Sequence, residues 1–173
     1  AVGTYYDRHE LWLNNGTSDP FNDVSAIIVG IEMDPTESLA VGDMDGDGDL
    51  DVVTSNGGDA AIGASAFEPN RLYLNRLPGQ PFGTIKPGAI GIESDDTTCI
   101  AIGDVDNDGD LDLLIATADP SSAYLYKNNG SGHFTIHRSW AGIRGYMGGF
   151  GDLDNDGDLD LAFTGHSYYY LND

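Results

Sequence analysis

Three copies of one acidic segment dominate this sequence: Gly42-DMDGDGDLD-Val52, Gly103-DVDNDGDLD-Leu113 and Gly151-DLDNDGDLD-Leu161. Each copy has aspartate at positions 1, 3, 5, 7 and 9 of the loop and glycine at position 6. Carboxylates this close together repel one another strongly unless a cation neutralises them. Calcium is the natural ion, because it accepts many oxygen ligands in flexible geometry. The sequence therefore predicts three calcium sites, with these candidate ligands: Asp43, Asp45, Asp47, Asp49 and Asp51; Asp104, Asp106, Asp108, Asp110 and Asp112; Asp152, Asp154, Asp156, Asp158 and Asp160.

The EF-hand is the main alternative for a loop of this kind. An EF-hand needs a bidentate glutamate at position 12 of its loop. Position 12 is occupied here by Thr54, Ile115 and Phe163. The pattern therefore excludes an EF-hand and predicts another class of calcium loop.

Net charge limits the partners, and the supply of calcium indicates the compartment. The formal net charge is −22, which argues against a nucleic acid or an anionic membrane as partner, because both require basic patches. No run of apolar residues is long enough to predict membrane insertion. Cys99 is the only cysteine, which excludes an intrachain disulfide; this is neutral on the compartment, because calcium can supply the stabilisation that disulfides give many secreted domains. Calcium is plentiful outside cells, and we therefore expect an extracellular or cell-surface protein.

The segments around the acidic loops repeat as well. A short alternating segment precedes each loop, an apolar segment follows it, and a third segment rich in Leu, Tyr and Asn comes next, all with the pattern of β-strands. The repeat predicts an all-β fold of four-stranded antiparallel β-propeller blades, with the calcium loop between strands 1 and 2 of each blade. The expected units are residues 1–36 (a partial blade with strands 2–4), 37–96 and 97–144 (complete blades), and 145–173 (a partial blade with strands 1–3).

Gly149-Phe150-Gly151-Asp152 and the three loops resemble the FG-GAP, or VCBS, repeats of integrin-α-type calcium-binding β-propellers. The resemblance implies one Ca²⁺ per loop, held by the side chains at positions 1, 3, 5 and 9. At position 7 the family uses a backbone carbonyl, which leaves the carboxylates of Asp49, Asp110 and Asp158 spare. It also implies a ligand surface on the opposite face from the loops, formed by residues 57–69, 87–97 and 139–145.

The expected function is non-enzymatic: adhesion, recognition or assembly outside the cell, with calcium clamping the blades. No catalytic motif appears in the sequence, and the expected partner is another copy, another protein or a glycan. Two alternatives remain open. The chain is either a structural subunit of a homo-oligomer or filament completed by strand exchange, or a fragment of a larger propeller lectin or enzyme.

Two further features are candidates for surface roles. Asn15-Gly-Thr and Asn129-Gly-Ser are N-glycosylation sequons, expected between strands 3 and 4, where Asn-Gly is also a favoured hairpin turn. Trp140 is expected on a connection between blades, where it is a candidate for contact with a ligand.

Overall fold

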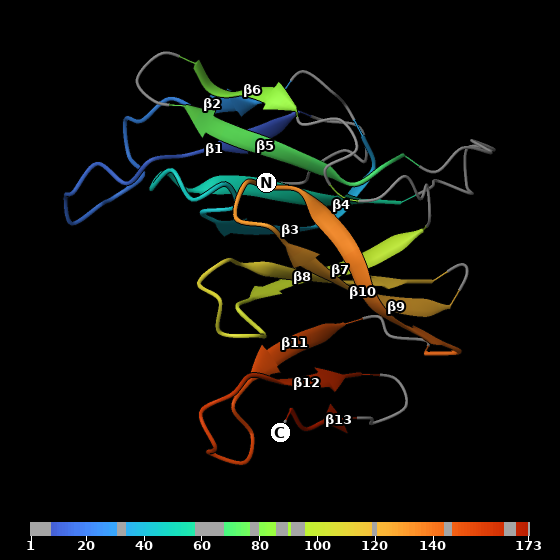
Figure 1. Cartoon of the computed structure of the whole chain (residues 1–173). Helices are drawn as coiled ribbons and strands as arrows, with labels where there is room; N and C mark the ends of the chain where they lie inside the picture. The colour runs from blue at the N-terminus through green and yellow to red at the C-terminus, as the bar shows by residue number, and fades with distance from the viewer. Residues whose placement is uncertain are drawn as a thin grey trace.

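The structure is a computed structural model of the 173-residue chain, and it describes residues 8–30, 34–57, 68–76, 80–85, 90, 96–118, 121–143, 147–164 and 169–172. All regular elements in these residues are β-strands, arranged as four antiparallel sheets (Figure 1). The described part of the chain contains no helix with the length and apolar character that a membrane crossing requires.

Each sheet is built from consecutive strands of the chain. The first sheet contains β1 (His9–Leu11) and β2 (Ile27–Val29), and the second contains β3 (Thr36–Gly42), β4 (Asp51–Asn56), β5 (Arg71–Arg76) and β6 (Gln80–Ile85). The third sheet contains β7 (Thr97–Gly103), β8 (Asp112–Thr117), β9 (Ser122–Asn128) and β10 (Phe134–Ala141). The fourth contains β11 (Gly148–Gly151), β12 (Asp160–Phe163) and β13 (Tyr169–Tyr170). The second and third sheets confirm the expected four-stranded antiparallel unit. Residues 1–7, where the second strand of the first partial blade is expected, lie outside the described residues.

The second, third and fourth sheets lie one upon another in chain order (Figure 1), and the first sheet packs against the second. Strands β4 and β8 are buried along their whole length, because a neighbouring sheet covers each of their faces. Strand β10, at the outer edge of the third sheet, is mostly exposed. The apolar runs that follow the acidic loops are therefore the central strands of the stack.

Two apolar layers join the last three sheets. The layer between the second and third sheets contains these buried side chains: Met44, Val53, Leu72, Leu74, Ile90, Ile100, Leu113, Ile115, Tyr126 and Phe134. The layer between the third and fourth sheets is formed by Leu114, Ala123, Ile143, Leu161 and Phe163, with Trp140 and Tyr170 packed against it. Full burial of one such large side chain contributes about 1.5–3 kcal/mol, so these layers supply much of the folding free energy.

Glycine permits close approach of the sheets beside the acidic loops. A Cβ atom on Gly42 would lie 2.6 Å from Leu111 Cδ1, and one on Gly103 would lie 2.9 Å from Leu159 Cδ1. Both leucines occupy position 8 of a loop and pack on the glycine that ends the first strand of the preceding sheet. The glycines before the first two acidic loops are therefore contact points for the next sheet.

The position of Trp140 differs from the sequence prediction. Trp140 lies within β10 rather than on a connection, so the expected ligand segment at 139–145 begins inside a strand. Its ring packs edge-on against Phe163, with 5.8 Å between ring centroids, and lies 5.4 Å from the Tyr170 ring. The prediction was wrong because β10 continues to Ala141, through the polar residues before Trp140.

Candidate metal centres

The three acidic loops occupy equivalent places in three sheets. They join β3 to β4, β7 to β8 and β11 to β12, and all three project from the same side of the stack (left in Figure 1). This is the position that the sequence predicts, between the first and second strands of each unit. We number the nine loop residues 1–9 in each copy, beginning at Asp43, Asp104 and Asp152.

The aspartate at position 1 shapes each loop. Asp43 accepts hydrogen bonds from the backbone N–H groups of Gly46 (2.8 Å), Asp47 (3.1 Å) and Gly48 (2.9 Å). Asp104 accepts from the N–H groups at positions 5 and 6 of its own loop, and Asp152 from those at positions 4, 5 and 6. The chain therefore wraps around the first carboxylate, and the glycine at position 6, with φ of 93° in Gly48, provides the left-handed turn that closes the wrap.

The aspartate at position 9 connects the loop to the sheet. Asp51 is fully buried and accepts hydrogen bonds from the backbone N–H groups of Met44 (2.9 Å) and Asn75 (2.8 Å). The same pair of bonds recurs in the other copies: Asp112 accepts from Val105 and Asn128, and Asp160 accepts from Leu153 and Asn172. Each of these carboxylates therefore holds the start of its loop against the third strand of its sheet.

Carboxylates converge in each loop closely enough to hold one ion. The clusters with ligand oxygens within 4.8 Å of one another are Asp43, Asp45 and Asp51; Asp104, Asp106 and Asp108; and Asp152, Asp154 and Asp160. Together they use positions 1, 3, 5 and 9, the positions that the family resemblance assigns to side-chain ligands. Position 7, which is Asp49, Asp110 and Asp158, belongs to none of the clusters. Its backbone N–H instead donates to the aspartate at position 5 in every loop.

The loops fit a hard divalent cation. The donor set consists of oxygen atoms, the kind of ligand that calcium prefers. Asp45 Oδ1 is buried and has no hydrogen-bond partner among the described residues, and the nearest cation to this carboxylate is Arg76 Nη2, 3.9 Å from Oδ2. A buried carboxylate oxygen without a partner is energetically unfavourable, so a cation bound in the first loop would stabilise it.

The pKa shifts of two of the three position-9 aspartates also indicate that a cation is required. Burial raises the pKa of Asp51, against the lowering effect of its two backbone hydrogen bonds, and nearby loop carboxylates raise it further. The pKa of Asp112 is raised by the same causes. In Asp160 the backbone hydrogen bonds dominate, and they lower the pKa. In the first two loops the ionised carboxylate is therefore disfavoured until a cation compensates the burial and the repulsion.

The sequence prediction missed the asparagine that ends the third strand. The Asn128 side chain donates from Nδ2 to the carbonyl of Met44 (2.9 Å), in the acidic loop of the preceding sheet. Asn172 donates in the same way to the carbonyl of Val105 (3.1 Å). Since the backbone N–H of each asparagine also binds the position-9 aspartate of its own sheet, it links two consecutive loops. The signal was present in the sequence, where asparagine follows Leu or Lys at the end of each Leu/Tyr-rich segment.

Both sequons lie in exposed connections between the expected third and fourth strands. Asn129 follows β9 directly, and its Oδ1 accepts hydrogen bonds from Ser131 and His133. Asn15 lies in the longer connection between β1 and β2, and its Nδ2 donates to the carbonyl of Asn22 (2.9 Å). Asn15 Nδ2 also donates to the carbonyl of Asp19 (3.4 Å), and glycosylation, which replaces one of its two hydrogens, would remove one of these two bonds, whereas no bond from Asn129 Nδ2 is present among the described residues.

Comparison with known proteins identifies the same three-fold repeat. A family model described as an FG-GAP-like repeat matches residues 1–54, 58–115 and 104–163. No curated protein matches the chain. Because the three matches cover far more than half of its 173 residues, the chain belongs to the family of FG-GAP-like repeat proteins.

Proposed function

We propose that the chain is a segment of a calcium-clamped β-propeller that acts without catalysis outside the cell, in adhesion, recognition or assembly. The observation that carries this proposal is the recurrence of one loop geometry in three sheets, each with converging carboxylates and with backbone N–H groups that donate to the aspartates at positions 1 and 9. FG-GAP repeats imply propeller blades, and the stacked antiparallel sheets support that architecture.

The role that we assign to calcium is structural. An ion bound at positions 1, 3, 5 and 9 would hold the start of the loop to its end. The aspartate at position 9 in turn accepts a hydrogen bond from the third strand, as Asp112 does from the Asn128 N–H. The side chain of that asparagine donates to the preceding loop, at the carbonyl of Met44. An ion in the second or third loop would therefore stabilise both its own sheet and the contact with the sheet before it. An ion of this kind would also lower the pKa of its ligands, so the loop carboxylates would be poor general acids.

The compartment and the partners follow from charge and ion supply. A chain with a net charge of −22 requires a medium rich in divalent cations to keep its loops folded, which supports an extracellular or cell-surface location. The same charge disfavours nucleic acid and anionic lipid as partners. The proposed partner is another copy, another protein or a glycan.

Counting the bound ions tests this proposal. Isothermal titration of the metal-free chain with calcium, supported by native mass spectrometry, is expected to give three equivalents per chain. Magnesium is expected to bind much more weakly, because it dehydrates reluctantly and demands near-ideal octahedral geometry. Binding of one equivalent or none would contradict the assignment of the three loops.

Self-assembly is a second candidate, supported by exposed apolar side chains on β3 and its loop in the second sheet and by the outer face of the fourth sheet. Leu39, Val41 and Leu50 are 57%, 48% and 58% exposed on the second sheet. Their counterparts one repeat later pack against the preceding sheet. On the fourth sheet, Gly151 has no atom within 4 Å of a Cβ position, and Leu153 is 53% exposed, whereas Met44, its counterpart in the second sheet, is fully buried.

These two surfaces are complementary in a head-to-tail sense. Leu50 of one copy would pack on Gly151 of another, as Leu111 packs on Gly42 within the chain. Such a heterologous contact forms rings or filaments of further repeats. Light scattering in millimolar calcium is expected to show a mass that rises with concentration, and Leu39→Asp is expected to abolish the rise. A monomer at every concentration would contradict self-assembly. The exposed apolar side chains of β3 and its loop would then be available to other repeats or partners.

A further inference from the structure

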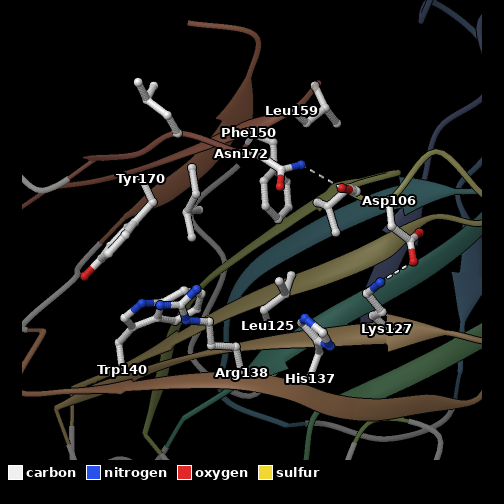
Figure 2. Close-up of a pocket in the computed structure, with 13 residues that line it drawn as sticks. Asp106, Leu125, Lys127, His137, Arg138, Trp140, Phe150, Leu159, Tyr170 and Asn172 are labelled. Carbon is white, nitrogen blue, oxygen red and sulfur yellow. Dashed lines mark hydrogen bonds and ion pairs between the residues drawn. The ribbon is translucent and has the colours of Figure 1, made fainter. Parts of the chain in front are cut away.

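A pocket of about 190 Å³ lies between the outer strands of the third sheet and the fourth sheet. Strands β9 and β10 contribute Lys127, Arg138 and Trp140 to its wall, and Phe150 and Tyr170 line it from the fourth sheet (Figure 2). Pockets for drug-sized ligands measure roughly 300–1,000 Å³. This pocket is therefore suited to a small group, such as one end of a larger molecule.

The pocket arises where one repeat departs from the others. In each repeat, one asparagine donates its backbone N–H to the aspartate at position 9. The residue directly before this asparagine is Leu74, Lys127 or Leu171, so these three positions are equivalent. Leu74 is 2% exposed and belongs to the apolar layer between the second and third sheets. In the next repeat a lysine occupies this place and lines the pocket instead. The third sheet thus presents a charged group where the preceding sheet has a packed leucine.

The groups that line the pocket are rich in hydrogen-bond donors. The Arg138 guanidinium lies 5.1 Å from the centre of the Trp140 ring and 5.9 Å from that of Tyr170, so aromatic faces orient it. The ion pairs of the described residues do not include Arg138, although the chain has 29 acidic and only seven basic residues. The Trp140 Nε1 atom is buried and has no hydrogen-bond partner among the described residues. A buried indole N–H without a partner is costly, and an acceptor atom in the pocket would satisfy it.

Lys127 connects the pocket to the second acidic loop. Its Nζ forms an ion pair with Asp106, which also lines the pocket (Figure 2). Asp106 belongs to the carboxylate cluster of that loop, so calcium would compete with Lys127 for this carboxylate. Loading of the loop would thereby free the ammonium group for an anion and add positive charge at the rim of the pocket.

We propose that this pocket binds a small carboxylate with an apolar body, either a free organic acid or the carboxyl terminus of a peptide. Arg138 would bind the carboxylate through its fork of N–H groups, Trp140 Nε1 would donate a further hydrogen bond, and the aromatic and leucine side chains would cover the apolar body. The contribution of Lys127 rests on the proposed calcium loading of the second loop, whereas those of Arg138 and Trp140 do not.

Binding of N-acetyl-leucine to the full chain in millimolar calcium tests the inference. Trp140 fluorescence in a Trp12→Phe background reports on the pocket directly, and titration calorimetry gives the affinity. We expect saturable binding of N-acetyl-leucine and none of its neutral amide. Isocaproate, which shares the carboxylate and the branched chain, separates the two sources: equal affinity indicates a free acid, and weaker affinity indicates a peptide terminus.

Two variants test the residues that bind the carboxylate, and a third serves as a control. Arg138→Gln and Lys127→Leu are each expected to weaken binding by about tenfold or more, since each removes a charged donor. Lys127→Leu introduces the residue of the other two repeats, so the fold is expected to persist. Arg8→Gln removes an exposed cation on the residue before β1 and is expected to leave affinity unchanged.

Equal binding of the neutral amide, or no binding of the acid by a chain that takes up three calcium ions, would overturn the inference and leave the calcium proposal intact. Carboxylate binding by a chain that takes up no calcium would overturn the calcium proposal and the role of Lys127, while supporting that of Arg138.

Discussion

Removal of calcium is expected to unfold the chain at temperatures where the calcium-loaded chain is stable. A ligand that binds only the folded state stabilises it by about 2.7 kcal/mol when its free concentration is about 100 times Kd. Three such sites contribute roughly 8 kcal/mol, which is comparable with the whole stability of an ordinary domain, about 5–15 kcal/mol. Without the ions, five aspartates in each loop repel one another, and for Asp51 and Asp112 burial outweighs the backbone hydrogen bonds and disfavours the ionised carboxylate.

Circular dichroism melts in chelator and in millimolar calcium measure this effect. The melting temperature is expected to rise with calcium concentration over a wide range. Two controls separate specific binding from general screening: added sodium chloride, which weakens the repulsion between exposed charges, and magnesium at the same concentration as calcium. Identical melts in chelator and in calcium would contradict a structural role for the ion.

Replacement of Asp51 by asparagine is expected to have the second largest effect. The substitution removes a fully buried member of the first carboxylate cluster and disturbs its bonds to the N–H groups of Met44 and Asn75. In calcium we expect a loss of about 2–4 kcal/mol of unfolding free energy, because a charged acceptor and a metal ligand disappear together. The bound calcium is expected to fall from three equivalents to two.

Asp49→Asn is the matched control, since it removes the same charge from the same loop. Asp49 belongs to no carboxylate cluster, and we expect it to change stability by less than about 0.5 kcal/mol and to retain three ions. In chelator the two variants are expected to differ less, because burial and neighbouring carboxylates raise the pKa of Asp51 and make its charge unfavourable there. Equal effects of the two variants in calcium would show that the loop responds to net charge rather than to a bound ion.

The sequence by itself determined the local features of this protein. The acidic loops are predictable because their carboxylates lie within nine residues of one another, and glycine at position 6 makes a turn that needs no distant contact. The strands are predictable because alternating and apolar runs, separated by turn residues, have few other stable structures. The four-stranded antiparallel unit follows from the succession of such strands within each repeat, and the repeat extends it along the chain.

Only the tertiary structure decided which distant residues meet. The bond from Asn128 to Met44 joins residues 84 positions apart, and no local pattern encodes that partnership. The placement of Trp140 in β10, against Phe163, depends on how the fourth sheet lies on the third, and the sequence prediction was wrong there. Lys127 lines a pocket rather than an ordinary solvated surface for the same reason. Local propensity acts over a few residues, whereas the packing of one sheet on the next is set by side chains from several strands at once.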